Sequence, residues 1–484
     1  MRVLHVASEV APFAQSGGLA DVVAGLPAAQ AQVAETHVGV LVPMYRGVAE
    51  RLAASGVTLD PGTEMFLSVG PHVFRAALRR ATIHRVEHGF VDCAALFDRP
   101  GNLYGPGGPA EWPDNHLRFA ALGQAALAAG ELMLGARHDV LHVHDWQGGP
   151  AAIYARLAAN PPTIVTTIHN LAYRGIFPKS VMTEVGFPWS VFTSGLVEFY
   201  DQVSFLKGAL AMSDVVTTVS PSYAKEILTP VFGEALDGFL VHHVKRLVGI
   251  VNGIDTDAWD PATDTTLPAP YSAGSPAGKA ACKRALADEI GLPLPEDEPL
   301  IGVIARMTGQ KGLDLVAEIA PELHRLGARL AVLGAGEPDL ETQFTYLATT
   351  FSEHVYARIG FDIGLARRIY ASSDLFVMPS RFEPCGLGQL YAMRYGAIPI
   401  VHAVGGLRDT VIDPGDRELA RGHGTGITFA PATAPALLEA IERGIALFRD
   451  RRAFAALRTS AMSRDSSWTA SARDYLQLYA SLRM

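Results

Sequence analysis

The chain has 484 residues, more than the roughly 250–300 at which one hydrophobic core stops growing, so at least two domains are expected. Hydrophobic residues make up 49% and charged residues 18%, a composition that excludes a disordered chain. The 40 Lys and Arg against 49 Asp and Glu give a formal net charge of −9, which provides no overall positive field for nucleic acid or an anionic membrane.

The cysteines and the apolar runs indicate the compartment. Cys93, Cys282 and Cys385 cannot build a disulfide framework, and their odd number indicates a reducing environment. The apolar run over residues 1–7 is too short for a signal peptide, and no stretch approaches the ~20 uninterrupted apolar residues of a membrane span. We therefore expect a cytoplasmic protein without a membrane anchor.

Short apolar runs of strand length alternate with helical patterns in two series, which is typical of parallel βαβ units. The first series predicts strands near 2–7, 37–43, 139–144, 162–168 and 214–219, with an amphipathic helix near 113–134. The second series predicts strands near 299–305, 328–333, 354–359, 373–379 and 397–402.

Between and after these series lie a linker and a tail. A hinge is expected near 246–251, followed by a surface excursion over 261–297 that is rich in Pro, Ala, Asp and Ser. The tail carries Trp468, Tyr475 and Tyr479 in a helical pattern, which predicts a helix that packs on another part of the protein.

Polar residues at strand ends are the first candidates for a site, because open α/β sheets bind ligands at the carboxyl ends of their strands. After the first strand, Gln15 and Asp21 flank the pair Gly17 and Gly18, which opens a helix. Such a turn leaves backbone N–H groups to meet a phosphate. An ordinary strand-to-helix turn is the alternative, since the Lys of a P-loop is missing.

His142 and His144 stand at the end of the third strand of the first series. Alternate residues on a strand share a face, so this pair could bind zinc, and a metallohydrolase is one alternative. His169 stands alone in the sequence and His242 lies in a helical pattern, so no second cluster has the spacing of metal ligands. We favour a hydrogen-bonding His at a sugar site and expect no metal.

The second series carries cations and a carboxylate at its strand ends. Arg306 and Lys311 follow the strand 299–305 and could neutralise a diphosphate without a metal. Glu383 follows a later strand where a helix opens, and could hold a sugar hydroxyl beside a phosphate. Cys385 is interpreted as a packed small residue, because no His adjoins it.

Two other patterns are interpreted as structural. Residues 333–336 lack the third Gly of a dinucleotide fingerprint. Asp255 and Asp257 resemble the aspartate pair with which some glycosyltransferases hold a cation, but such a pair is common in loops.

Motifs along almost the whole chain are similar to those of bacterial glycogen synthases and plant starch synthases. They include VLHVASEVAPFAQSGGLADVVAGLP, HVHDWQ, TTIHNLAYRGIF, ARMTGQKGLDL and PSRFEPCGLGQLYAMRYG, in this order. The resemblance implies an α/β fold of the GT-B type, in which two Rossmann-like parallel-sheet domains, here 1–245 and 246–460, face a central cleft. It also implies a C-terminal helix over 461–484 that crosses back to the first domain.

The activity implied by the resemblance is retaining transfer of glucose from ADP-glucose to the non-reducing end of an α-1,4-glucan such as glycogen, with release of ADP and without a metal or other cofactor. Arg306 and Lys311 then hold the diphosphate, Glu383 is the essential carboxylate and His144 contacts the donor glucose. Donor binding is implied for Gln15, Gly17, Gly18, Asp21, Asn252, Phe361, Cys385, Gly386 and Leu387, with Phe361 stacking on the base.

Two departures from the family pattern leave alternatives open. Gln15 stands where relatives typically carry Lys, and Phe97 where they often carry Tyr. A retaining transferase that uses UDP-glucose or another acceptor is therefore one alternative. A non-catalytic glucan- or nucleotide-sensing protein of the same fold is a second, against which the complete set of catalytic candidates speaks.

Overall fold

The computed structural model describes residues 1–108 and 110–483, and the chain divides into two compact units. Unit 1 comprises Met1–Gly253 and the C-terminal segment from Trp468, and unit 2 comprises Ile254–Ser467. The first boundary falls later than the expected 245/246, because β12 (Leu247–Gly249) pairs with β11 (Val215–Thr218) at the edge of the first sheet. The segment expected to be a hinge is thus a strand of unit 1.

The sheet of unit 1 has the strand order β12-β11-β7-β6-β1-β2-β5-β4-β3. The predicted strands of the first series are confirmed as β1 (Arg2–Val6), β2 (His37–Pro43), β6 (Val140–His144), β7 (Thr163–Ile168) and β11. The sequence did not predict β3 (Thr63–Val69), β4 (His72–Ile83) and β5 (Val86–Asp92), which extend the sheet through antiparallel pairs of β4 with β3 and β5. Strand β1 pairs in parallel with β2 on one side and β6 on the other, so the strand order reverses at β1.

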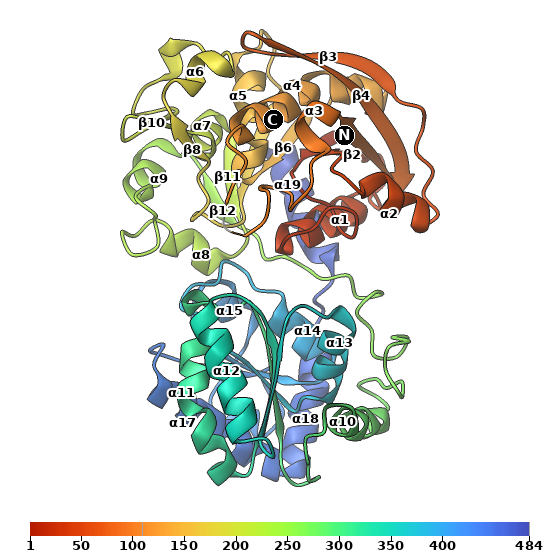
Figure 1. Ribbon diagram of the computed structural model, residues 1–484, viewed down its shortest axis with the longest axis vertical. Coiled ribbons are helices and arrows are strands. Elements are labelled where there is room, and N and C mark those ends of the chain that lie inside the picture. The colour runs from red at the N-terminus through yellow and green to blue at the C-terminus, as the bar shows by residue number, and fades with distance from the viewer. Residues whose placement is uncertain (109, 484) are drawn as a thin grey trace. The chain divides into compact units, whose positions relative to one another are not determined.

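The helices of unit 1 follow its strands (Figure 1). They are α1 (Gly18–Gln30), α2 (Val48–Ala54), α3 (Ala94–Phe97), α4 (Asn115–Leu134), α5 (Asp145–Leu157), α6 (Val181–Glu184), α7 (Phe205–Met212), α8 (Pro221–Glu226) and α9 (Asp237–His243). A small sheet is formed by β8 (Ile176–Pro178), β10 (Gln202–Ser204) and β9 (Glu198–Phe199). Helix α4 is long and apolar enough to cross a membrane, but most of it is buried in packing against α5 and the sheet.

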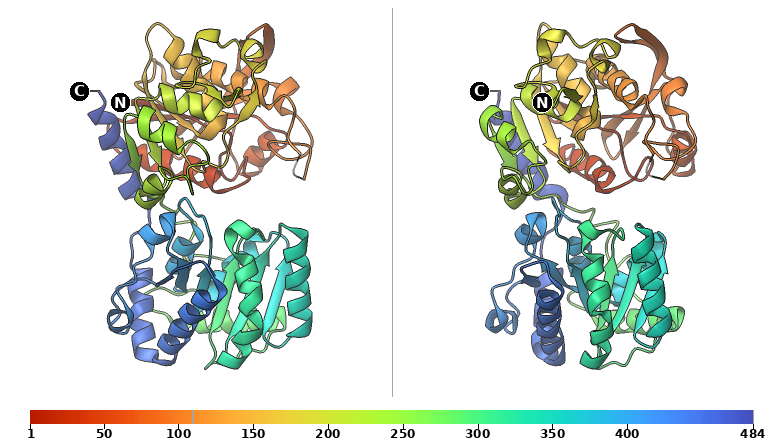
Figure 2. Two further views of the ribbon diagram at one scale, coloured as in Figure 1. Left: turned by 90° about the vertical axis from the view of Figure 1, so that its left-hand side faces the viewer. Right: turned by 60° about the vertical axis from the view of Figure 1, so that its left-hand side comes forward.

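Unit 2 has a parallel sheet of order β15-β14-β13-β16-β17-β18, with helices on both faces (Figure 2). Its strands are β13 (Leu300–Ile304), β14 (Arg329–Gly334), β15 (Val355–Ile359), β16 (Leu375–Met378), β17 (Ile398–His402) and β18 (Ile427–Phe429). Its helices are α10 (Ala277–Ile290), α11 (Leu313–Leu323), α12 (Pro338–Thr350), α13 (Ile363–Ser372), α14 (Gly388–Arg394), α15 (Gly405–Thr410), α16 (Asp416–Leu419), α17 (Ala434–Arg449) and α18 (Arg451–Met462). The predicted strands of the second series are confirmed, and the order reverses between β13 and β16, which is a topological switch point.

The last helix, α19 (Trp468–Ser481), returns to unit 1 and packs on α1 (Figure 1). Trp468, Tyr475 and Tyr479 are buried in this contact. A Cβ atom at Gly25 of α1 would lie 2.0 Å from the Trp468 Nε1 atom, so only glycine allows the helix to approach this closely. The prediction of an aromatic C-terminal helix that crosses back to the first domain is confirmed.

Candidate active site

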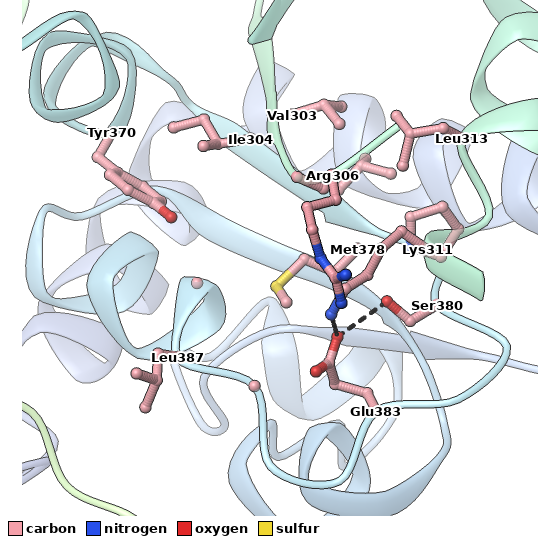
Figure 3. Close-up of a pocket in the computed structure, with 15 residues that line it drawn as sticks. Val303, Ile304, Arg306, Lys311, Leu313, Tyr370, Met378, Ser380, Glu383 and Leu387 are labelled. Atoms are coloured by element: carbon pink, nitrogen blue, oxygen red, sulfur yellow. Dashed lines mark hydrogen bonds and ion pairs between the residues drawn. The ribbon is translucent and has the colours of Figure 1, made fainter. Parts of the chain in front are cut away.

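A cavity of about 220 Å³ lies at the switch point of unit 2, between the carboxyl ends of β13 and β16 (Figure 3). Open α/β sheets bind ligands at this position, because the connections on either side of a switch point leave in opposite directions. The lining residues are Val303, Ile304, Ala305, Arg306, Lys311, Leu313, Tyr370, Val377, Met378, Pro379, Ser380, Glu383, Gly386, Leu387 and Gly388.

An ion pair occupies the polar side of this cavity. Lys311, in the turn before α11, donates a hydrogen bond from Nζ to Glu383 Oε2 at 2.5 Å, and Ser380 Oγ donates to the same oxygen at 3.1 Å (Figure 3). The side chain of Glu383 is only 7% exposed. No described residue bonds to Glu383 Oε1, so this oxygen can accept a hydrogen bond from a ligand hydroxyl.

Arg306 lies two residues after the end of β13, and its side chain extends toward the same cavity (Figure 3). The side chain is exposed, and no ion pair with another described residue engages it. The two positive charges of Arg306 and Lys311 exceed the single negative charge of Glu383, which leaves net positive charge at the switch point. Such a site suits a phosphate-bearing ligand.

Arg381 ties together the two loops that carry the ion pair. Its guanidinium donates to both carboxylate oxygens of Asp314, at 2.7 and 2.6 Å, and its backbone N–H donates to Gln310 O at 2.9 Å. The hydrogen bond from Arg381 holds the pKa of the Asp314 carboxyl below its usual value. Nothing in the sequence pattern singles out Arg381, because its partner Asp314 lies 67 positions away.

The residues of the segment 385–387 do not all lie at the cavity. Gly386 and Leu387 line the cavity, whereas Cys385 is buried and lies outside the lining. Gly386 has φ of +73°, and Gln389 Nε2 donates to the carbonyls of Cys385 and Gly386 at 3.0 and 2.9 Å. Cys385 is thus a packed residue that supports the turn, as interpreted from the sequence.

The remaining candidate of unit 2 lies outside the cavity. Phe361 follows β15 at the carboxyl edge of the sheet, and its side chain is 89% exposed. Asn252, Gln15, Gly17, Gly18 and Asp21 all belong to unit 1, where Asn252 is buried.

Part of the Gly-Gly turn of unit 1 is bonded to a carboxylate of the same unit. Glu9 Oε2 accepts hydrogen bonds from the backbone N–H groups of Ser16 and Gly17, at 2.6 and 3.2 Å. Its other oxygen accepts from Ser16 Oγ at 2.5 Å and from the Tyr104 hydroxyl. A carboxylate 8 positions upstream therefore already holds the Gly17 N–H group, one of the groups that could meet a phosphate.

Asp21 adds a second carboxyl group to this turn. Gln15 Nε2 donates to Asp21 Oδ2 at 3.3 Å, and burial, with a smaller effect of the Glu9 charge, raises the pKa of Asp21 to about 6. Gly18 is the first residue of α1. Carboxylates accept hydrogen bonds from hydroxyl groups and repel phosphates, so the turn suits a sugar rather than a diphosphate.

The structure does not support direct contact of His144 with a ligand. His144 is fully buried at the end of β6, and its Nε2 and Nδ1 atoms lie 3.0 and 2.9 Å from ring nitrogens of His5 and His169. No ring nitrogen is left for a sugar hydroxyl. The outer member of this group is His169, which is only partly buried. The sequence pattern did not indicate a role for His169, because no other candidate ligand lies near it in the sequence.

Asp145 holds the loop of His169. Its Oδ1 atom accepts a hydrogen bond from the His169 backbone N–H at 2.7 Å, and burial raises the pKa of this carboxyl to about 7. Asp145 has φ of +52°, a strained conformation for a non-glycine residue that often marks a functional site.

Two other expectations concern side chains outside these sites. Asp255 Oδ1 accepts hydrogen bonds from the backbone N–H groups of Asp257 and Ala258, at 3.0 and 2.9 Å, so the aspartate pair closes a turn. Phe97 is 1% exposed and packs edge-on against Tyr45, so this departure from the family pattern falls on a core side chain.

Two units of open α/β sheet, with cations and a carboxylate at a switch point, define the class of the protein as a glycosyltransferase of the GT-B fold. Residues 2–242 match the family described as starch synthase catalytic domain, and residues 298–446 match glycosyl transferases group 1. The glycogen synthase of Anaeromyxobacter dehalogenans (strain 2CP-C) is 47% identical over 489 residues and 100% of both chains, and that of Roseobacter denitrificans is 41% identical over 482 residues and 99% of both. The chain belongs to the glycogen and starch synthase family.

Solved structures agree with this assignment. The catalytic domain of starch synthase IV from Arabidopsis thaliana, bound to ADP and acarbose, matches with a TM-score of 0.88 and 33% identity over 99% of both chains. Sucrose-phosphate synthase from Thermosynechococcus elongatus matches with a TM-score of 0.58 and 18% identity, which reflects the shared fold.

Proposed function

We propose that this protein transfers glucose from ADP-glucose to the non-reducing end of an α-1,4-glucan, with retention of configuration and release of ADP. The observation that carries the proposal is the Lys311–Glu383 pair beside Arg306 in the switch-point cavity of unit 2. The similar starch synthase IV structure is described as bound to ADP and acarbose, a pair that fits a nucleotide donor and a glucan acceptor.

The charges of the cavity suit the departure of a nucleoside diphosphate. Arg306 and Lys311 supply positive charge where negative charge develops on the leaving phosphate, which stabilises the transition state more than the ground state. Glu383 Oε1 accepts a hydrogen bond from a donor hydroxyl, while Oε2 stays bonded to Lys311 and Ser380. The carboxylate also stabilises the positive charge that develops on the sugar ring.

Retention follows in this proposal from attack on the face of the leaving group. The departing phosphate oxygen takes the proton of the incoming hydroxyl, so no protein nucleophile is needed. No metal is needed either, because Arg306 and Lys311 provide the charge that a divalent cation provides in other transferases.

The acidic turn of unit 1 supports hydroxyl recognition through Asp21. This residue lies in the first turn of α1 and can accept a hydrogen bond from a sugar. Both oxygens of Glu9 already accept hydrogen bonds within the unit. His169, as the partly buried end of the histidine group, takes the sugar contact that the sequence assigned to His144.

A UDP-glucose donor is the second candidate, favoured by one observation. Gln15 is exposed and bonded to Asp21, so this corner of unit 1 carries no cation from that position.

We place the protein in the cytoplasm, since Cys93, Cys282 and Cys385 are buried and form no disulfide with one another.

The direct test is to incubate the purified protein with glycogen and radiolabelled ADP-glucose or UDP-glucose. We expect label in the polymer with ADP-glucose, in linkages that an α-1,4-specific amylase releases. Proton NMR of the first-formed linkage should show the α anomer. If glucose is transferred from UDP-glucose and not from ADP-glucose, the donor in this proposal is wrong. If neither nucleotide sugar supports transfer, the proposed function is refuted.

A further inference from the structure

A chain of hydrogen bonds runs through the interior of unit 1 from the C-terminal helix to His169. The Tyr479 hydroxyl of α19 accepts from Gln30 Nε2 at 3.2 Å, and Gln30 Oε1 lies 2.8 Å from His5 Nε2. His5 Nδ1 lies 3.0 Å from His144 Nε2, and His144 Nδ1 lies 2.9 Å from His169 Nε2. The first four residues are fully buried, whereas His169 is only partly buried.

The amide of Gln30 gives this chain a direction. Burial lowers the pKa of His5 to about 4, that of His169 to about 3 and that of His144 well below its usual value, so each ring is neutral near pH 7 and carries one N–H. Because Gln30 Oε1 can only accept, the proton of His5 is on Nε2. His5 Nδ1 then accepts from His144 Nε2, and His144 Nδ1 accepts from His169 Nε2.

A second branch agrees with this direction. The Tyr479 hydroxyl accepts from Gln30 and can therefore donate to His142 Nδ1, at 2.6 Å. His142 Nε2 then donates to Thr167 Oγ1 at 2.6 Å, and this hydroxyl donates to Thr217 Oγ1 at 2.6 Å. Each of these bonds has one donor and one acceptor, so the network is internally consistent.

The same bonds explain why three histidines gather here. Ligand atoms of His5, His142 and His144 lie within 4.8 Å of one another, a spacing that a metal ion could bridge. A metal takes a lone pair from each ring. In this network every ring nitrogen of the three residues already donates or accepts a hydrogen bond. We therefore interpret the group as part of the hydrogen-bond chain.

The outer end of the chain is an acceptor. With its proton on Nε2, His169 keeps a lone pair on Nδ1, and no described residue bonds to that atom. A lone pair accepts from the O–H group of a sugar, whereas it repels a phosphate oxygen, which is itself an acceptor.

We propose that Tyr479 and Gln30 are positioning residues for glucosyl transfer. Through His5 and His144 they hold His169 in the Nε2–H tautomer, so that its Nδ1 accepts a hydrogen bond from a hydroxyl of the sugar substrate. The nature of that substrate rests on the proposed function. The inference gives the C-terminal helix a part in the chemistry as well as in the fold.

The test is NMR of the protein labelled with ¹⁵N at its histidines, because protonated and unprotonated ring nitrogens have distinct shifts. Loss of one signal set in His169→Asn assigns the ring. We expect an unprotonated Nδ1 in the wild type. Gln30→Leu removes the oxygen that accepts from His5, and Tyr479→Phe removes the acceptor of Gln30 Nε2 that holds the amide with its oxygen toward His5. In both variants we therefore expect mixed tautomers of His169 and a fall in kcat of about tenfold, or ~1.4 kcal/mol, with little change in the KM for ADP-glucose.

Two further variants separate positioning from stability. Gln30→Glu keeps an oxygen that accepts from His5, so it should retain the wild-type tautomer. Tyr154→Phe removes a buried tyrosine hydroxyl of the same unit, bonded to Val185 O at 2.5 Å, outside the chain. It should lower stability without moving the tautomer or kcat.

A protonated Nδ1 at His169 in the wild type would overturn the inference. An unaltered tautomer in both Tyr479→Phe and Gln30→Leu would do the same. A wild-type protein that transfers no glucose would refute the proposed function, while the tautomer measurement would still decide the role of the two residues.

Discussion

Lys311→Ala removes the cation that is bonded to Glu383 in the unit 2 cavity. The carboxylate of Glu383 is 7% exposed, so it stays buried and keeps only the 3.1 Å bond from Ser380 among its side-chain bonds in the described structure. A hydrogen bond to a charged group contributes ~1.5–3 kcal/mol, and this sets the scale of both the stability loss and the kinetic loss.

On that scale, the substitution should lower the melting temperature by several degrees, at roughly 2–4 °C per kcal/mol for a unit of this size. The lost contact with the diphosphate should lower kcat/KM for ADP-glucose at least about tenfold. The measurements are thermal unfolding and steady-state transfer to glycogen at saturating acceptor.

Lys283→Ala is a matched control in the same unit. Lys283 Nζ lies 2.7 Å from Asp374 Oδ2, with side chains 13% and 7% exposed, and neither residue lines the cavity. It should lose comparable stability and keep its kcat/KM. Near-normal kinetics in folded Lys311→Ala, or an equal kinetic loss in the two variants, would refute the assignment of Lys311 to the diphosphate.

Four other outcomes are expected. Glu383→Gln keeps the size of the side chain but removes its charge, so kcat should fall about 10²–10³-fold in a folded protein. A smaller fall in kcat than that of Lys311→Ala would contradict the catalytic role of Glu383. Transfer should survive EDTA, and activity that vanished and returned with Mn²⁺ would reopen the question of Asp255 and Asp257. Gln15→Lys adds a charge beside Asp21 and should lower the KM for ADP-glucose with kcat nearly unchanged, with a smaller gain at high salt; a raised KM would count against it. Since the folded-state pKa of Asp21 is raised to about 6, the folded protein binds this proton more tightly than the unfolded chain. The free energy of unfolding should therefore decrease as pH rises from about 4 to about 6, and denaturation of Asp21→Asn should show less of this slope.

Much of the fold was predictable because the parallel strands are buried on both faces and appear as continuous apolar runs. The sequence did not reveal β3, β4 and β5, since charged and polar residues interrupt the apolar runs of these segments. The segment 63–69, for example, alternates exposed and buried residues only in its second half. The end of unit 1 was misplaced because a strand as short as β12 has no distinct pattern.

The sequence by itself determined the two α/β series and the cavity residues Arg306, Lys311 and Glu383, because each follows a buried strand and parallel strands end at one edge of a sheet. Only the tertiary structure decided that Glu9 fills the Gly-Gly turn and that His144 is buried behind His169. The physical reason is that these outcomes depend on which partner a polar side chain meets, for Glu9 the backbone N–H groups of a turn and for His144 the ring of His169. Local sequence patterns specify which residues of a strand or helix are buried, but they do not specify which group of another segment meets a given hydrogen-bond donor or acceptor.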